Sequence, residues 1–450
     1  MRVAPAVACV AVVAACLGAT SSAHANGRFP FASQLVVDPG DATHIVLRTT
    51  YGLVQSVDGG KSWQWLCEKS VGYGGQLDPA IAVTAGGTLL AGVFDGLSVS
   101  TDRACSWAYA PGILDKQYVI DVSVLKSAPK SAVALTSTGA TDAGFFVVVA
   151  ASKDDGKTWT QQGAAIPDDF TSETLDVAPS NPKRIYVSGF HGTPHVAAIE
   201  RSDDDGASWQ RLDIPLANGA APYIAAIDPT DADVVYVRVD LDGPDALLVT
   251  RDAGKTWSNA YGAKGDLLGF ALSPDGSRVA LGGTKDGLRV AGKGDLAFVK
   301  TSDVATRCLT WTKDGLFVCA SEFPDGFTAA VTIDEGKTYT PLYHLTDLTQ
   351  LSCPAGTSTA RECPSQWDNV VLTLGIGDDA GPLDDAGPAD TGKPPGKNPV
   401  GPAPASGGCG CGLVGVTAPL GGGLAASLAL LAVAARRRRR SGLRSHPVRP

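Results

Sequence analysis

The stretch Ser152-Lys153-Asp154-Asp155-Gly156-Lys157-Thr158-Trp159 decides the fold of this chain, because the 450-residue sequence repeats it. Three further copies keep Ser or Thr, then Asp, Gly and a closing Trp at the same spacing, and two weaker copies have Ala for Gly or Tyr for Trp. We call each copy a repeat turn; the six lie at residues 56–63, 100–107, 152–159, 202–209, 250–257 and 332–339. They begin 44, 52, 50, 48 and 82 residues apart, so the last interval is long enough to contain a decayed copy.

Two short apolar runs, separated by a cluster of Pro, Asp, Asn or Gly, precede each repeat turn, as in 175–190 and 224–239. This arrangement predicts a strand, a turn and a second strand. Residues 267–299 show it with only a vestige of the repeat turn at 292–295, which brings the units to seven. Units of about 40–50 residues with four strands are typical of propeller blades. We therefore predict an all-β, seven-bladed β-propeller with four-stranded blades over 26–374, with six blades as the alternative.

Each repeat turn combines residue types that stabilise a tight turn. The Asp side chain can accept hydrogen bonds from the backbone of its own turn, Gly adopts positive φ, and the aromatic residue can be buried between blades. A calcium loop needs oxygen ligands at alternate positions, and Arg201 stands two residues before Asp203, so we predict no metal and no cofactor. The residues to which we assign this structural role are Asp58, Trp63, Asp102, Trp107, Asp154, Trp159, Asp204, Trp209, Asp252, Trp257, Asp334 and Tyr339.

The pattern S-x-D-x-G-x-[ST]-W resembles the Asp box of the bacterial-neuraminidase repeat, and the resemblance covers roughly residues 29–345. Related propellers include sialidases, sortilin-type receptors and photosystem assembly factors. In that superfamily the Asp box lies between the outer two strands of a blade, remote from the ligand face. The resemblance thus implies that the ligand site lies elsewhere.

An axial ligand site on a propeller forms where the innermost strands begin. The polar residues predicted at those positions are Gln34, Asp78, Tyr118, Glu173, Tyr223, Asp266 and Arg307, and Arg28 can join them. Sialidases use a Tyr nucleophile paired with Glu, an Asp acid/base and three arginines that bind the substrate carboxylate. Here Glu173 and Tyr223 fall in adjacent units, and Gly27-Arg28-Phe29-Pro30 partly matches the Arg-Ile-Pro motif of sialidases. Only Arg28 and Arg307 are available for the arginine cluster, however, and six blades are the sialidase norm.

Two functions of different classes are compatible with these residues. We favour a noncatalytic module that binds a cell-surface or extracellular protein or glycan. The alternative is an exo-acting glycoside hydrolase of sialidase type, with Arg28, Glu173, Tyr223 and Arg307 as its catalytic candidates.

The N-terminal end of the chain predicts export. Residues 1–25 carry Arg2, an apolar run and Ala23-His24-Ala25, the small-x-small pattern of a signal-peptidase site. The formal net charge is -9, but eight of the 37 basic residues lie in the signal peptide and the last fifteen residues, which hold no acids. The exported body therefore has 29 basic and 46 acidic residues, which argues against nucleic acid as a partner.

The C-terminal end predicts a spacer followed by a membrane span. Residues 375–408 are rich in Gly, Pro and Asp, which is typical of a disordered, extended linker. The uncharged run 412–435 is long enough to cross a bilayer, and arginines 436–440 follow it. Positive charge after the span predicts that the propeller faces outward from the cell.

The order of a Cys motif, a span and an arginine cluster over 409–441 resembles the myxobacterial carboxy-terminal sorting signal, and a basic tail follows at 442–450. This resemblance implies that a processing protease removes the span. It also implies attachment at the cell surface or outer membrane through a modified cysteine, Cys409 or Cys411.

Six cysteines lie in the exported body, and an even number in an exported chain predicts disulfides. Pairs close in sequence are the candidates, although six cysteines allow fifteen pairings. These candidates are Cys67 with Cys105, Cys308 with Cys319, and Cys353 with Cys363.

Overall fold

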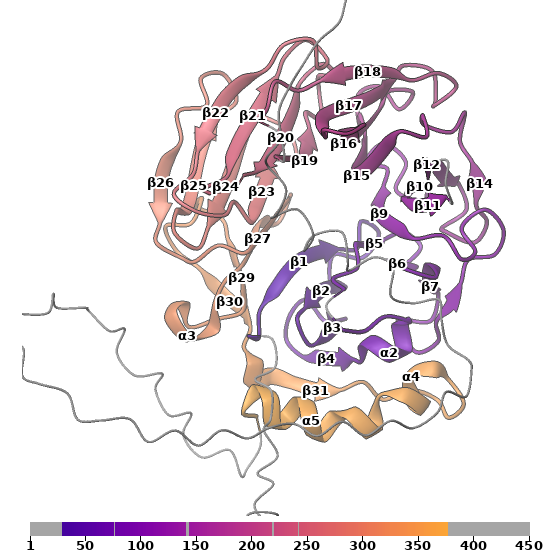
Figure 1. Ribbon diagram of the computed structural model, residues 1–450. Coiled ribbons are helices and arrows are strands. Elements are labelled where there is room, and N and C mark those ends of the chain that lie inside the picture. Colours follow the sequence, from indigo (N-terminus) through magenta and orange to yellow (C-terminus); the bar gives the residue numbers. More distant parts are fainter. Residues whose placement is uncertain (1–28, 76, 141–143, 218–219, 242, 377–450) are drawn as a thin grey trace, which may run out of the picture. The chain divides into compact units, whose positions relative to one another are not determined.

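The computed structural model describes residues 29–376 except 76, 141–143, 218–219 and 242, and within them the strands form seven blades of four antiparallel strands around a central axis, with a fifth, parallel strand added to the first blade (Figure 1). The protein is a seven-bladed β-propeller, so the predicted fold is confirmed and the six-bladed alternative is wrong. No helix in this described part is long and apolar enough to cross a membrane. Several predicted features lie outside the described residues: the signal peptide, Arg28, spacer residues 377–408, the span, Cys409, Cys411 and the basic tail.

Each blade is built from four strands in chain order, beginning with the innermost. Blade 1 contains β1 (Ala32–Val37), β2 (Ile45–Thr49), β3 (Gly52–Ser56) and β4 (Trp63–Leu66), and blade 2 contains β5 (Ile81–Val83), β6 (Leu89–Val93), β7 (Gly96–Ser100) and β8 (Ala108–Tyr109). Blade 3 contains β9 (Val119–Val124), β10 (Ala132–Thr136), β13 (Val149–Ser152) and β14 (Thr160–Gln161), and blade 4 contains β15 (Phe170–Val177), β16 (Ile185–His191), β17 (Val196–Ser202) and β18 (Gln210–Asp213). Blade 5 contains β19 (Ala221–Ile227), β20 (Val235–Asp240), β21 (Ala246–Thr250) and β22 (Ser258–Gly262). Blade 6 contains β23 (Gly269–Leu272), β24 (Arg278–Gly283), β25 (Gly287–Gly292) and β26 (Val299–Ser302), and blade 7 contains β27 (Cys308–Thr312), β28 (Gly315–Cys319), β29 (Ala329–Thr332) and β30 (Thr340–Tyr343).

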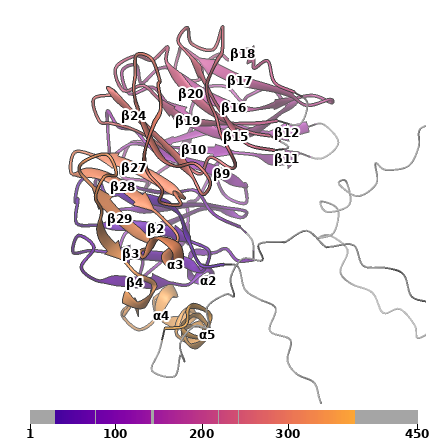
Figure 2. The same ribbon diagram turned by 90° about the vertical axis from the view of Figure 1, so that its left-hand side faces the viewer.

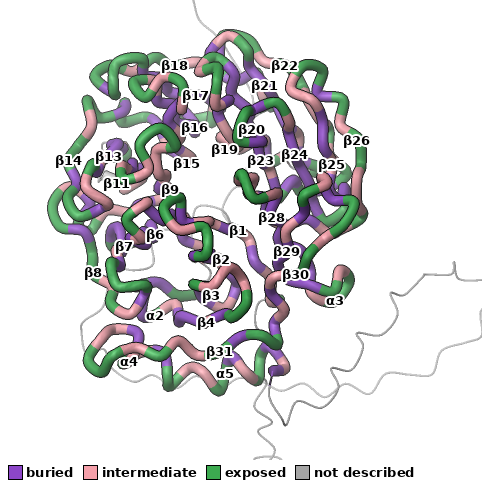
Figure 3. Tube along the Cα trace, turned by 180° about the vertical axis from the view of Figure 1, so that it is seen from behind, coloured by how far each residue is buried: buried purple, intermediate pink, exposed green. Residues whose placement is uncertain are grey.

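The hydrophobic core is divided among the blade interfaces. Each pair of neighbouring blades shares a cluster of buried apolar side chains, and the strands that carry them are buried while the connections are exposed (Figure 3). The aromatic residue of each repeat turn packs into the cluster between its own blade and the preceding one, as Trp159 does between blades 3 and 2. A blade has two apolar faces and so needs a neighbour on both sides, which is why the ring must close.

Blade 3 carries an extra hairpin of β11 (Thr138–Ala140) and β12 (Gly144–Phe146) between its second and third strands. The side view shows this hairpin standing at one edge of the ring (Figure 2). The short helices α2 (Glu68–Val71) and α3 (Glu322–Asp325) lie in connections after blade 1 and within blade 7.

The ring closes through the segment that follows blade 7, which we call the strap (residues 344–376). It contains a 3-10 turn, η1 (Leu345–Asp347), and β31 (Leu348–Gln350), which pairs in parallel with β4 at the outer edge of blade 1. It then forms α4 (Ser358–Glu362) and α5 (Pro364–Leu374), which follow one another along the outer edge of the ring beside blade 1 (Figure 1). The sheet of blade 1 therefore has five strands, four from the N-terminal end of the described chain and β31 from its C-terminal end.

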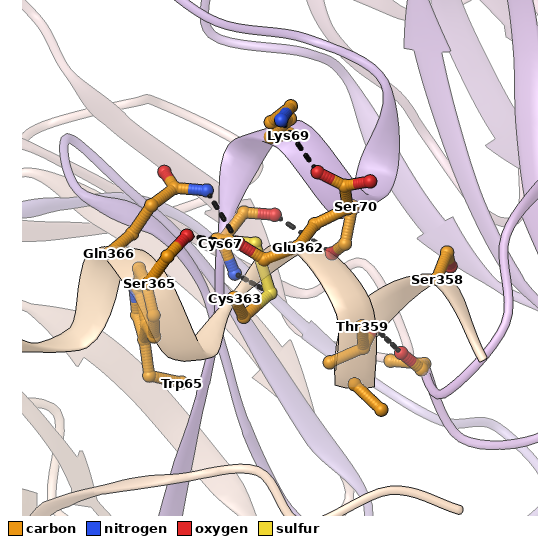
Figure 4. The surroundings of a disulfide bond; sticks show 12 residues. Trp65, Cys67, Lys69, Ser70, Ser358, Thr359, Glu362, Cys363, Ser365 and Gln366 are labelled. Carbon is orange, nitrogen blue, oxygen red and sulfur yellow. Dashed lines mark hydrogen bonds and ion pairs between the residues drawn. A yellow bond between two sulfur atoms is a disulfide. The ribbon is translucent and has the colours of Figure 1, made fainter. Parts of the chain in front are cut away.

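Two of the three disulfides bind the strap to the ring. Cys67 at the end of β4 is bonded to Cys363 between α4 and α5 (Figure 4), and Cys105 in blade 2 is bonded to Cys353. The predicted pairs Cys67 with Cys105 and Cys353 with Cys363 are therefore wrong, since proximity in sequence does not anticipate the return of the strap over blades 1 and 2.

The predicted pair Cys308 with Cys319 is confirmed; it links the facing strands β27 and β28.

Candidate functional site

The repeat turns join the third and fourth strands of six blades, and their acids are occupied by hydrogen bonds. In the copy at 152–159, the Asp154 carboxylate accepts the N–H of Thr158 at 2.9 Å and the hydroxyls of Thr158 and Ser152 at 2.7 and 2.8 Å. The backbone bond from Thr158 is the main reason that the pKa of Asp154 falls to about 2. Gly156 has φ +76°, which favours glycine, and its carbonyl accepts the indole N–H of Trp159. These contacts assign the carboxylate to the turn.

The blade 2 copy differs because it holds the strap. Ala104 replaces the usual glycine and keeps a positive φ of 71°. Its carbonyl accepts the Thr359 hydroxyl at 2.6 Å, and the next residue, Cys105, forms the disulfide to Cys353. This copy thus departs from the repeat pattern at Ala104-Cys105, the two residues that also bind the strap.

The two faces of the ring are defined by their connections. The upper face comprises the connections that lead into each first strand and those that join second to third strands, such as 29–31 and 94–95. The lower face comprises the turns that join first to second strands and the repeat turns. The predicted axial residues belong to the upper half of the channel.

Several polar residues of the innermost strands link neighbouring blades instead of facing a ligand. Gln34 exchanges two hydrogen bonds with the backbone of Ile81 in blade 2. Asp121 in blade 3 accepts the N–H of Leu175 in blade 4 at 2.8 Å, and burial raises the pKa of Asp121 to about 6. The prediction of Gln34 as a ligand-facing residue is therefore not supported, because both ends of its amide are bonded to blade 2.

The structure places Glu173 and Tyr223 in one electrostatic cluster between blades 4 and 5. Glu173 is the extra residue of a β-bulge in β15, since Ser172 and Thr174 face consecutive residues of β16. Burial raises its pKa to about 7, with Arg238 acting in the opposite direction. The negative charge of Glu173 in turn helps burial to raise the pKa of Tyr223. Within the described residues the Glu173 carboxylate forms no hydrogen bond or ion pair, so it is available to a ligand.

Arg238, which sequence reasoning missed, completes this cluster. Its guanidinium lies 4.5 Å from the centre of the Tyr223 ring and forms an ion pair with the buried Asp245 at 3.1 Å. A cavity of about 200 Å³ opens beside it, between blades 5 and 6, lined in part by Leu268 and Phe270. The strand pattern points to residues at the start of first strands, whereas Arg238 lies on the second strand of blade 5.

The remaining predicted axial residues lie apart from this cluster or only touch it electrostatically. Arg307 donates to the Ser321 hydroxyl at 2.8 Å and lies 4.2 Å from the centre of the Phe31 ring. The Tyr118 ring stacks on Phe94 at 4.5 Å, and Glu173 contributes to the raised pKa of Tyr118. Asp266 is exposed in blade 6, and the backbone carbonyl of Asp78 accepts a hydrogen bond from Arg48.

The arginines on the described part of the upper face do not share a partner. Arg48 bonds Ser33 and the carbonyl of Pro79, Arg238 pairs with Asp245, and Arg307 bonds Ser321. To bind one carboxylate, three arginine side chains must point toward the same ligand atoms. The partners of Arg48, Arg238 and Arg307 given above are all different groups, so these contacts do not assemble such a clamp.

A feature that the sequence search overlooked is a set of exposed phenylalanines. All five phenylalanines that are exposed in the described part of the chain lie on the upper face, with exposed fractions between 36% and 58%. They belong to the adjacent blades 7, 1, 2 and 3, and we call them the phenylalanine arc: Phe29, Phe94, Phe145, Phe146 and Phe323. Phe29 and Phe323 touch edge to face with ring centres 5.8 Å apart, which joins the arc across the ring closure.

No protein-family model matches the sequence, and no curated protein does. Among solved structures, an ancestral GH74 enzyme matches with a TM-score of 0.53 and 19% identity, over 70% of this chain and 46% of that enzyme. A puromycin-hydrolyzing peptidase of Mycobacterium tuberculosis matches with a TM-score of 0.45 and 14% identity, over 73% of this chain and 55% of the peptidase. A Hadza microbial sialidase gives 0.40 and 14%, over 63% and 72%.

This chain therefore spans less than half of the ancestral GH74 enzyme. At these identities the likeness is one of fold: the chain is similar to propellers that are mostly enzymes, and its own activity has to be argued from its residues.

Proposed function

We propose that this protein is a noncatalytic binding module, exported and held at the cell surface, that binds a protein partner through the upper face of blades 7, 1, 2 and 3. The single observation that carries the proposal is the phenylalanine arc. Large apolar side chains on a soluble surface are unremarkable when scattered, but five of one kind on one face of four adjacent blades mark an interaction surface.

The charge of this face supports a partner that is apolar and cationic. The upper-face connections of blades 2 and 3 expose Asp95, Asp115, Asp168 and Asp169, with Lys116 as their cation. Carboxylates around aromatic side chains favour partners with Lys or Arg beside apolar residues, since opposite charges speed association and disfavour anionic competitors. A protein segment meets both requirements better than a neutral glycan does.

The polar groups nearer the axis support binding over hydrolysis. Each arginine is engaged with its own partner, and Gln34 is bonded to the neighbouring blade. Glu173 and Tyr223 are close enough to influence one another, so the sialidase-type alternative retains a residue pair but lacks an assembled arginine clamp.

Surface display rests on the sequence signals at the two ends. The signal peptide predicted at 1–25 and the sorting signal that 409–441 resembles support a location outside the cell. The acidic body and the spacer after it suit a module that must extend away from an anionic membrane.

Site-specific photocrosslinking on the displayed, full-length protein tests the proposal. We expect a photoreactive phenylalanine analogue at Phe94 to capture a protein, and the same analogue at Ile333, an exposed lower-face position, to capture none. A Phe94→Ser/Phe323→Ser variant should lose the crosslinked partner while keeping the melting temperature within about 2 °C, because both rings are largely exposed.

Equal capture at both positions would contradict the upper-face assignment. Binding to a glycan array, with no protein captured, would show that the partner is a glycan and not a protein. Turnover of a fluorogenic sialoside that Glu173→Gln abolishes would establish the hydrolase alternative instead.

A further inference from the structure

The lower mouth of the axial channel contains two overlapping cavities that the proposed function does not use. One has a volume of about 470 Å³ and is lined by residues of blades 1, 3, 5, 6 and 7. The other, of about 410 Å³, is lined by blades 1, 2 and 3. They share Val37, Pro39 and Lys126, so together they form a funnel around the axis, which we call the lower funnel.

The wall of the lower funnel is mainly apolar because the blade repeat places a proline in the turn after several first strands. Pro39, Pro229 and Pro274 line the larger cavity from blades 1, 5 and 6, together with Leu272. Proline is common in such turns for its fixed φ, and here its ring also faces the axis. Trp311 is the one aromatic residue among those that line the larger cavity, and it is only partly buried. Cavities of about 300–1,000 Å³ with apolar walls and few polar groups are the usual form of small-molecule sites.

The charged groups that line the larger cavity leave one cation available. Asp38 is buried and bonded to His44 and to the backbone of its own turn. Lys313 and Asp314 are paired with each other at 2.7 Å. Lys126 is exposed and, within the described residues, forms no hydrogen bond or ion pair.

The charge of Lys126 has its clearest electrostatic effect on the carboxylate of Asp176. It lies on the first strand of blade 4, and its side chain accepts the N–H of Val177 at 2.8 Å. Burial raises the pKa of Asp176, and the charge of Lys126 acts against this rise. Asp176 accepts its hydrogen bond from the backbone, and Lys126, which forms no ion pair in the described residues, lines both cavities of the funnel.

We propose that the lower funnel binds a small organic anion with an apolar ring system, its ring against Trp311 and the prolines and its anionic group beside Lys126. An apolar wall favours a ring-bearing ligand, and an unpaired ammonium group at the rim adds selectivity for a single negative charge. This site lies on the face opposite the phenylalanine arc, and it stands or falls independently of the proposed function.

Two fluorescent probes that share a ring system distinguish the contribution of the apolar wall to binding from that of the Lys126 charge. Anilinonaphthalene sulfonate carries one negative charge, and N-phenylnaphthylamine is its uncharged counterpart. Both are titrated into the full-length protein, with emission followed by energy transfer from tryptophan. Lys126→Gln should weaken binding of the sulfonate probe about fivefold and leave binding of the uncharged probe unchanged. The reason is that the exposed ion pair between Lys126 and the sulfonate contributes to binding of the anionic probe alone.

Matched variants identify the site. Lys130→Gln, in the same turn but outside the cavity walls, should leave both probes unchanged. Trp311→Ala should weaken both probes at least about tenfold, since it removes the main apolar surface. The melting temperature of Trp311→Ala is measured alongside, so that loss of binding by a folded variant is distinguished from loss of folding. Phe94→Ser should retain this binding, which excludes the phenylalanine arc as the probe site.

Equal effects of Lys126→Gln and Lys130→Gln would overturn the anion selectivity. Unchanged binding of both probes to Trp311→Ala would overturn the site itself.

Discussion

Removal of the disulfide between Cys67 and Cys363 should destabilise the propeller more than removal of the hairpin disulfide in blade 7. The expected loss follows from the loop that each bond closes. Cys67–Cys363 spans 296 residues, but Cys105–Cys353 already closes 248 of them, so the additional loop is 48 residues. Closure entropy for that loop corresponds to about 4 kcal/mol at 25 °C, against about 3 kcal/mol for the 11-residue loop of Cys308–Cys319.

The perturbation is the double substitution Cys67→Ala/Cys363→Ala, with Cys308→Ala/Cys319→Ala as the matched control. All four cysteines are buried, and alanine avoids leaving either a free thiol or an unbonded hydroxyl in the core. For a domain of this size, 4 kcal/mol corresponds to a fall in melting temperature of about 5 °C, and the control should fall by about 4 °C. Calorimetry under oxidising conditions resolves the two.

Limited proteolysis adds a readout that is specific to the strap. Arg361 is exposed in α4, two residues before Cys363, and trypsin should cut there once the strap detaches from blade 1. The control variant should keep Arg361 protected. If the control loses as much stability as the strap variant, and Arg361 remains uncut in both, then the strap does not close the ring and the loop argument fails.

Three further substitutions test individual groups. Asp154→Asn should lower the melting temperature at pH 7 and do so much less at pH 2, because the depressed pKa of about 2 gives stability that is complete above about pH 4 and is lost as the pH falls through about 2; a pH-independent difference would contradict this. Glu173→Gln should raise the melting temperature at pH 8 and leave it unchanged at pH 4, since a folded pKa of about 7 means that ionisation costs stability as pH rises; carboxyl carbon NMR of the six glutamates should show one titration near pH 7, and its absence would refute the cluster. Ala104→Gly should increase the unfolding free energy by about 0.5 kcal/mol in denaturant titrations, because glycine tolerates the positive φ there, whereas a decrease would mean that the buried methyl matters more.

The blades could be predicted from sequence because their signal is local and repeated. Each unit carries its own strands, turn residues and closing aromatic residue within about 50 residues, and a single blade is stable only beside others. The closure of the ring could not be predicted, because β31 and the strap disulfides join residues that are hundreds of positions apart. The departure from the repeat pattern at Ala104-Cys105 was visible in the sequence. Its cause, the contacts of these two residues with the strap, was not.

The candidate site was predicted in part for a similar reason. Placement of Glu173 and Tyr223 at the start of first strands followed from the strand pattern, and in the structure the charge of Glu173 contributes to the raised pKa of Tyr223. Whether a polar residue faces the channel or a neighbouring blade depends on packing, which is why Gln34 was misassigned. Phe94 precedes Asp95-Gly96 in a turn, where a large apolar residue is unusual, so the sequence did hold a signal for the phenylalanine arc.

In a chain with forty aspartates and six glutamates, the presence of a carboxylate says little about function. What distinguishes one acid from another here is its partners. Asp154 accepts three hydrogen bonds and keeps a pKa of about 2, and Asp121 uses an oxygen to hold the next blade. Glu173 has a raised pKa, lies on a bulge and is bonded to nothing in the described chain. A partly buried carboxylate without donors loses hydration that neither the turns nor the blade contacts replace, so a ligand that supplies a donor there would bind with that free energy in its favour.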